Sequence, residues 1–207
     1  MKLTRIIFAI AFFAFTTTGF AQDDLEKNIK DAKEFYAAKN LKEARYSLEQ
    51  ALQALDVVIG QEILKILPKE LNQYSFDEKQ DYVSGSSGGF TGLNVSRYYF
   101  DKSDSSKTMN ISIINNSPLI STLSAFMTNP MFMNSSDGSQ KSVRVAGYKG
   151  VLNKRTSDDI QTGYELQIPI GNTLMTYTCD GITKEADMLG LAEKVDIKSI
   201  AALAGSN

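Results

Sequence analysis

The sequence predicts an α+β protein: an N-terminal helical hairpin followed by an antiparallel sheet of five or six strands with packed helices. From residue 23 to about residue 67, apolar and small side chains recur every three or four residues, as in amphipathic helices. After Gly92 this period changes to two, which is typical of strands that bury one face. The chain is 43% hydrophobic and 22% charged, a balance that indicates a folded protein.

Residues 1–21 have the features of a signal peptide. Lys2 and Arg5 precede the apolar run IIFAIAFFAF, which is too short to span a bilayer, and small residues occupy positions 19 and 21. The alternative is an uncleaved membrane anchor. We expect cleavage before Gln22 and a periplasmic or secreted mature protein, soluble and not lipidated, because the single cysteine lies far from the cleavage point.

The helical hairpin is expected over residues 22–67. Its first helix carries Leu25, Ile29, Ala32 and Phe35, and its second carries Ala44, Leu48, Ala51, Leu52, Leu55 and Ile59. The segment KNL at 39–41 interrupts the pattern, and Asn40 suits the left-handed conformation of a helix end. The second helix should end before Pro68, and two forms are open: it runs through Gly60 to Leu67, or it bends or breaks at Gly60, which costs helix stability.

This stretch resembles one tetratricopeptide repeat. The small and large packing positions of that repeat fall on Ala32, Phe35, Ala44, Leu48 and Ala51, whereas Asp56 stands where the repeat has its terminal proline. No second repeat follows, and one repeat cannot bury its apolar face alone. We therefore expect the hairpin to dock on its own chain, against the sheet or against residues 63–67, unless it binds another protein.

The remainder divides into a connection and an α+β domain. Residues 68–92 are polar and end in a Gly/Ser cluster, which predicts a connection with a mobile loop. Within the domain, residues 93–207, strands are expected at 93–100, 108–116, 141–155, 163–170 and 173–179, the third being one long strand or two short ones. Helices are expected at 117–130 and 183–196, with a final helical turn after residue 197.

This order of elements resembles the α/β sandwich of the PsbP family. Small exported bacterial proteins of similar plan share it, together with the runs SPL, NP and GYKG in NNSPLIS, MTNPMF and VAGYKGV. The resemblance concerns topology, so no functional residue is carried over from it.

The composition removes most catalytic chemistry. The chain has no histidine, which excludes Ser-His-Asp and Cys-His catalysis and histidine-ligated zinc. Cys179 is expected to be a buried apolar residue on its strand, because no basic neighbour in the sequence would lower its pKa. SGSSGGFTG lacks the ending of a phosphate-binding loop, and DKSDSSKTMN lacks the spacing of a calcium loop. We therefore expect that the protein is not an enzyme and that it binds neither a cofactor nor a metal ion.

Two clusters indicate a contact surface. AFMTNPMFM, residues 125–133, brings Phe126, Met127, Met131, Phe132 and Met133 together, and YYF places Tyr99 among aromatics that face both sides of a strand. The alternative for the methionines is a loop that completes the core. Without Lys2 and Arg5 the chain has 20 basic and 24 acidic residues, a net charge of −4, which argues against nucleic acid and anionic membrane surfaces.

The sequence therefore favours a non-catalytic exported protein that acts as an interaction or scaffold module of the bacterial cell envelope. Its partner would be another envelope protein or a second copy, and a peripheral position at the outer membrane, without a transmembrane span after cleavage, is compatible with this. The alternative function is a carrier that holds a small apolar or lipid-like ligand between sheet and helix.

Overall fold

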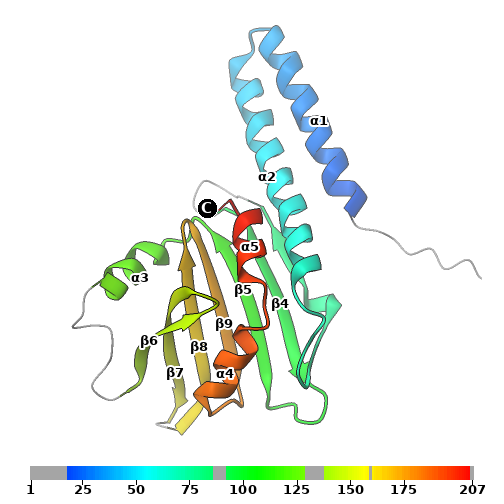
Figure 1. Cartoon of the computed structure of the whole chain (residues 1–207). Helices are drawn as coiled ribbons and strands as arrows, with labels where there is room; N and C mark the ends of the chain where they lie inside the picture. The colour runs from blue at the N-terminus through cyan, green and yellow to red at the C-terminus, as the bar shows by residue number, and fades with distance from the viewer. Residues whose placement is uncertain (1–17, 86–91, 129–137, 159, 206–207) are drawn as a thin grey trace, which may run out of the picture.

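A helical hairpin projects from one end of an antiparallel sheet (Figure 1). The computed structural model describes residues 18–85, 92–128, 138–158 and 160–205. The hairpin consists of α1 (Thr18–Ala37) and α2 (Leu41–Ile66). The predicted α+β class and the order of hairpin and sheet are confirmed. Most of the predicted signal peptide and of the Gly/Ser loop lies outside the described residues.

The turn of the hairpin uses two adjacent residues in different roles. Lys39 takes the left-handed conformation, with φ 58°, in place of the predicted Asn40. Asn40 instead caps α2, because its side-chain oxygen accepts a hydrogen bond of 3.5 Å from the Glu43 N–H. The seam between the helices is made of small buried residues, namely Ala32, Ala44, Ser47 and Ala51. Small side chains let the two helices approach closely.

α2 is continuous through Gly60, so of the two forms left open by the sequence the unbroken helix is the one observed. A Cβ at this position would lie 2.4 Å from Val83 Cγ1 and 2.9 Å from Leu93 Cδ1. The missing side chain therefore lets the helix backbone approach the sheet edge. The glycine serves packing between elements, which overrides its low helix propensity.

Within the described residues the sheet has nine strands in the order β1-β2-β4-β5-β9-β8-β7-β6, and β3 also pairs with β4. The long strands are β4 (Asn94–Asp101), β5 (Thr108–Asn115), β6 (Gln140–Val145), β7 (Tyr148–Ser157), β8 (Ile160–Ile170) and β9 (Thr173–Asp180). Every pairing is antiparallel. The predicted segment 141–155 forms two strands, because Ala146 and Gly147 make a tight turn with φ 49° and 87°.

The expected five or six strands were too few, since the predicted connection contains three more. They are β1 (Glu70–Leu71), β2 (Tyr74–Phe76) and β3 (Tyr82–Ser84), with a 3-10 turn at Glu78–Gln80. Strands of two or three residues are too short to display a period of two, so the alternation of apolar residues cannot reveal them.

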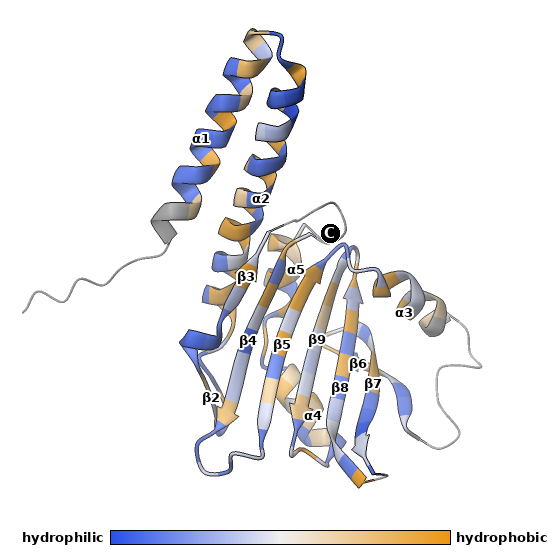
Figure 2. Cartoon of the chain, turned by 180° about the vertical axis from the view of Figure 1, so that it is seen from behind, coloured by the Kyte–Doolittle hydropathy of each residue, from blue (hydrophilic) through white to orange (hydrophobic). Residues whose placement is uncertain are grey.

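One face of the sheet carries the main core. The lower half of α2, α4 (Glu185–Ala192) and α5 (Ile197–Leu203) cover this face. Strands β4 and β5 alternate between buried and partly exposed residues, so the other face is largely solvated, as Figure 2 shows from behind. α3 (Leu119–Thr128) covers a corner of that second face over Val151 and Leu174. The core is thus one-sided and lies below the projecting part of the hairpin.

Candidate functional site: the leucine face of the hairpin

A row of leucines on the upper half of α2 is open to solvent. Leu41, Leu48, Leu52 and Leu55 are 63%, 54%, 61% and 40% exposed. Their spacings of seven, four and three residues place them on one side of the helix. Four large aliphatic side chains in one uncovered row are unusual for surface residues, which are normally scattered singly.

α1 adds two residues to this side of the hairpin. Ile29 and Tyr36 are 40% and 71% exposed, and they lie three residues before and four residues after Ala32, which is buried in the seam. The opposite side of the hairpin is different: a groove between the two helices is lined there by polar residues, Asp24, Asn28, Gln50, Gln53 and Gln61, together with the small or medium apolar residues Ala21, Ala54 and Val57. We call the six apolar residues, Ile29, Tyr36, Leu41, Leu48, Leu52 and Leu55, the leucine face.

The same stripe of α2 continues downward into the core. Ile59 and Ile66 pack against the core cluster, and Ile63 is fully buried in it. The expectation that the whole hairpin docks on its own chain is therefore right for the lower half of α2 and wrong for Leu48 and Leu52. The reason is geometric, since the hairpin extends beyond the end of the sheet that it would have to cover (Figure 1).

Charge is distributed unevenly along the hairpin. The basic tip, residues 30–45, has five basic residues (Lys30, Lys33, Lys39, Lys42, Arg45) and three acidic ones, a net charge of +2. The acidic base, residues 22–29 and 46–56, has five acidic residues (Asp23, Asp24, Glu26, Glu49, Asp56) and only Lys27 as a basic one, a net charge of −4. The ion pairs Lys30–Glu34, 3.9 Å, and Arg45–Glu49, 3.0 Å, are exposed on the hairpin surface.

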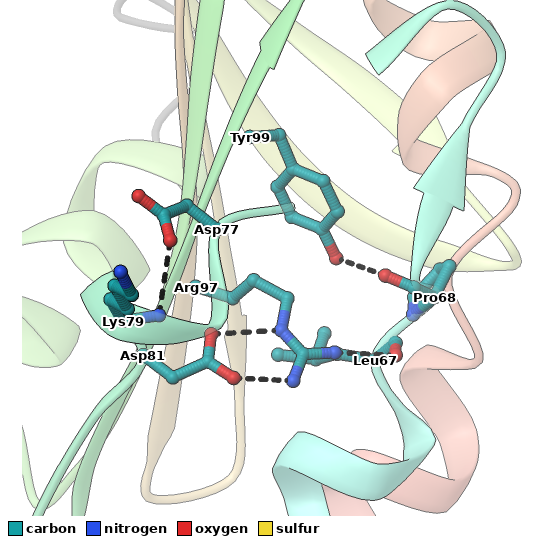
Figure 3. A network of polar contacts seen from close by, with 7 residues as sticks. All are labelled: Leu67, Pro68, Asp77, Lys79, Asp81, Arg97 and Tyr99. Carbon is teal, nitrogen blue, oxygen red and sulfur yellow. Dashed lines mark hydrogen bonds and ion pairs between the residues drawn. The ribbon is translucent and has the colours of Figure 1, made fainter. Parts of the chain in front are cut away.

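A buried polar network holds the lower end of α2 (Figure 3). Arg97 of β4 is 5% exposed, and its Nε and Nη2 donate to the two carboxylate oxygens of Asp81 at 2.9 and 2.6 Å. Its Nη1 donates to the Leu67 carbonyl at 2.8 Å, directly after the helix. The guanidinium carbon lies 4.4 Å from the ring centre of Phe76. Burial alone would lower the Arg97 pKa, but the paired Asp81 carboxylate raises it above its usual value.

Tyr99 completes this attachment. Its hydroxyl donates to the Pro68 carbonyl at 2.8 Å, and burial raises its pKa to about 12. The last carbonyl groups of a helix lack hydrogen-bond partners within the helix. Arg97 and Tyr99 supply donors to the carbonyl groups of Leu67 and Pro68, between the end of α2 and the start of β1. The upper half of the hairpin therefore projects from a lower end of α2 that is held in place by these hydrogen bonds.

Sequence reasoning missed Arg97 and Asp81. Asp81 lies in the stretch predicted as a connection, so no pairing with a strand residue could be anticipated. A signal existed for Arg97, because it shares the inward positions of NVSRYYF with Val95 and Tyr99. A charge at an inward position of a strand requires a buried partner.

Two of the predicted contact residues, Tyr99 and Met127, are placed by the structure, and they lie on opposite faces of the sheet. Tyr99 is fully buried, as just described, and so is not at a surface. Met127 is half-buried and packs with Leu123 of α3 onto the opposite face of the sheet. Met131, Phe132 and Met133 lie outside the described residues, as does the side chain of Phe126. The structure thus separates Tyr99 from Met127 by the thickness of the sheet.

Two further groups that could carry chemistry, Cys179 and Asp180, are buried or paired. The Cys179 thiol is fully buried, and this burial raises its pKa to about 12, so it is mostly protonated at neutral pH. Asp180 forms an ion pair with Arg155. A polar hollow of about 570 Å3 lies beside α4 and is lined by Lys107, Lys184, Asp187 and Lys194, among others. In residues 18–85, 92–128, 138–158 and 160–205 no three Asp, Glu, Cys or His side chains gather as a metal site.

Comparison with protein-family models, curated proteins and solved structures finds no match to this chain. No helix in the described ranges is both long enough and apolar enough to cross a bilayer.

Proposed function

We propose that this protein is a non-catalytic interaction module of the bacterial cell envelope and that the leucine face is its binding surface. The observation that supports this most is the uncovered row of Leu41, Leu48, Leu52 and Leu55. Water contact with such a row is unfavourable by roughly 25 cal/mol per Å2 of apolar surface, so a partner that covers it gains free energy. The firm attachment of α2 at Arg97 keeps the face pre-organised.

The location and the hairpin type support the same proposal. The sequence features of residues 1–21 favour export, and the mature chain would begin at Gln22, on α1. The likeness of residues 32–56 to one tetratricopeptide repeat supports a binding role for the apolar side of the hairpin, because hairpins of such repeats normally stack against a neighbouring helical element. Here a partner protein would supply that element.

The experiment compares three versions of the mature protein, residues 22–207, as bait in envelope extracts of the native host. Leu48→Asp/Leu52→Asp removes the centre of the leucine face. Tyr46→Asp is the matched control, since Tyr46 is 58% exposed and lies on the other side of α2. Circular dichroism and thermal unfolding establish that all three versions are folded.

The proposal predicts that wild type and the Tyr46 variant retain the same specific protein, and that the double variant loses it by more than tenfold. A charge placed in an apolar contact leaves that charge desolvated and unpaired, which is costly. Equal retention by the double variant would contradict the proposal, and so would the absence of any specifically bound protein, including a second copy of the bait.

A further inference from the structure

We infer that the partner of the leucine face is a second copy of this protein. Two hairpins associate antiparallel through their leucine faces and form a four-helix bundle. This inference rests on the proposed function, because it assigns the occupant of the same surface. Three properties of the hairpin support it: its charge distribution, the spacing of its leucines and the position of the sheet.

Charge complementarity favours the antiparallel arrangement. The basic tip has a net charge of +2 and the acidic base a net charge of −4. In an antiparallel pair each basic tip lies beside the acidic base of the other copy, twice over because of the two-fold symmetry. A parallel pair would place tip against tip and base against base, which brings like charges together.

Three of the four leucines, Leu41, Leu48 and Leu55, are spaced symmetrically about Leu48, whereas Leu52 lies opposite the small Ala44 of the other copy. A two-fold axis at Leu48 pairs Leu41 of one copy with Leu55 of the other, because both lie seven residues from it. It also brings Arg45 of each copy near Glu49 of the other, at the edge of the contact. Arg45 and Glu49 already lie 3.0 Å apart within one helix, so the four groups form an alternating cluster. Charged residues that flank an apolar contact between helices set the choice and orientation of the partner.

The sheet does not obstruct this contact. Leu41 to Leu55 spans about 21 Å of helix at about 1.5 Å per residue. Below it, at Ile59, α2 enters the core of its own domain. In the antiparallel pair that domain lies beyond the tip of the other hairpin, so the two sheets sit at opposite ends of the bundle. The apolar sides of α1, Ile29 and Tyr36, widen the contact to two helices from each copy.

The test is sedimentation velocity of residues 22–207 from about 1 to 100 μM, the range in which a contact worth roughly 6–8 kcal/mol becomes populated. The inference predicts conversion from one chain to two over this range. Leu48→Asp/Leu52→Asp should remain monomeric throughout, whereas Tyr46→Asp should dimerise as wild type does. A dimer that persists in the double variant would overturn the inference, since another surface would then be in use.

Charge reversal tests the antiparallel geometry. Lys33→Glu/Lys42→Glu reverses the tip, and Glu26→Lys/Glu49→Lys reverses the base. Each variant alone should dimerise at least tenfold more weakly than wild type, and a mixture of the two should recover part of the loss, because each reversed tip then meets a reversed base. Equal dimerisation of all forms would overturn the antiparallel arrangement.

The outcomes separate this inference from the proposed function. If wild type is monomeric at every concentration, self-association is wrong. The proposed function then survives only if the extract experiment recovers a different protein that the Leu48/Leu52 variant loses. If both experiments fail, the leucine face is not a binding surface.

Discussion

The two halves of α2 carry one continuous apolar stripe but have opposite surroundings. The lower half contributes Ile63, which is 0% exposed and belongs to the core, while Leu52 on the same stripe of the upper half is 61% exposed. Amphipathic spacing alone does not say what covers the apolar side. The length of the neighbouring sheet decides it, because α2 is longer than the part of the domain beside it (Figure 1).

The ion pairs near the lower and upper halves of α2 also differ in their exposure to solvent. At the lower end, Arg97 and Asp81 form a bidentate pair with side-chain exposures of 6% and 10%. On the upper hairpin, the pair of Arg45 and Glu49 has side-chain exposures of 83% and 56%. The buried pair therefore anchors the helix, and the exposed pair is free to respond to a partner and to salt.

The largest effect is expected from breaking the anchor. Arg97→Ala should lower the free energy of unfolding by about 3–5 kcal/mol, because it leaves the Asp81 carboxylate and the Leu67 carbonyl without their donor in a buried site. Urea denaturation measures this. The control is Lys65→Ala, which removes an exposed ion pair with Glu62 on the same helix and should cost no more than about 0.5 kcal/mol. Equal effects would show that the buried pair is not an anchor.

The next prediction compares the two halves of α2 directly. Ile63→Ala should cost about 2–5 kcal/mol, because it opens a cavity in the core. Leu52→Ala should change the unfolding free energy by no more than about 0.5 kcal/mol at concentrations where the protein is monomeric. Thermal or urea unfolding of both variants checks this. A cost above about 2 kcal/mol for Leu52→Ala would mean that the upper hairpin is packed within its own chain.

Alkaline pH should weaken the anchored region. Burial raises the Tyr99 pKa from 10.0 to about 12, so the folded state holds the phenolic proton more tightly than the unfolded state. The protonated Tyr99 phenol contributes about 2–3 kcal/mol to the free energy of unfolding. This contribution is fully present below pH 10 and is lost as the pH rises through about 12. Urea unfolding from pH 8 to 12 measures the slope. Tyr99→Phe should show a shallower decline, and an unchanged slope in that variant would exclude Tyr99 as a source.

The smallest effect separates two buried tyrosines. Tyr99→Phe removes a hydrogen bond to Pro68 and should cost about 0.5–1.5 kcal/mol. Tyr74 is equally buried, but its hydroxyl has no hydrogen-bond partner among the described residues. Tyr74→Phe should therefore be neutral or stabilise by about 1 kcal/mol, because it removes an unsatisfied buried group. Destabilisation by Tyr74→Phe comparable with that of Tyr99→Phe would contradict this difference.

Regular spacing explains what could be predicted from the sequence. The hairpin and strands such as β4 and β9 repeat their apolar residues over many positions, so their class and approximate bounds follow from one chain. β1 to β3 could not be found this way, because they have only two or three residues each, and β2 and β3 are held by pairing with β4, which comes later in the chain. The sequence left a break at Gly60 open for a related reason: helix propensity is local, whereas the close approach of Gly60 to Val83 arises only in the folded protein.

The candidate site was predicted less well than the fold. The sequence marked Leu48, Leu52 and Leu55 as the apolar side of a helix, but it could not reveal that the sheet stops short of them. Tyr99 was chosen as a contact because aromatics in succession face both sides of a strand. The alternation of the strand from Val95 onward contradicts this choice, since it places Tyr99 inward and its neighbour Tyr98 on the half-exposed face.

The most direct test of the leucine face is a photo-crosslinking scan along α2 in living cells of the native host. A photoreactive phenylalanine analogue is placed at Leu48, at Leu52 and, as a control on the other side of the helix, at Tyr46, which is 58% exposed. We predict protein crosslinks from positions 48 and 52 and none from position 46. Crosslinks of equal yield from all three positions, or from position 46 alone, would contradict a binding surface made by the leucines.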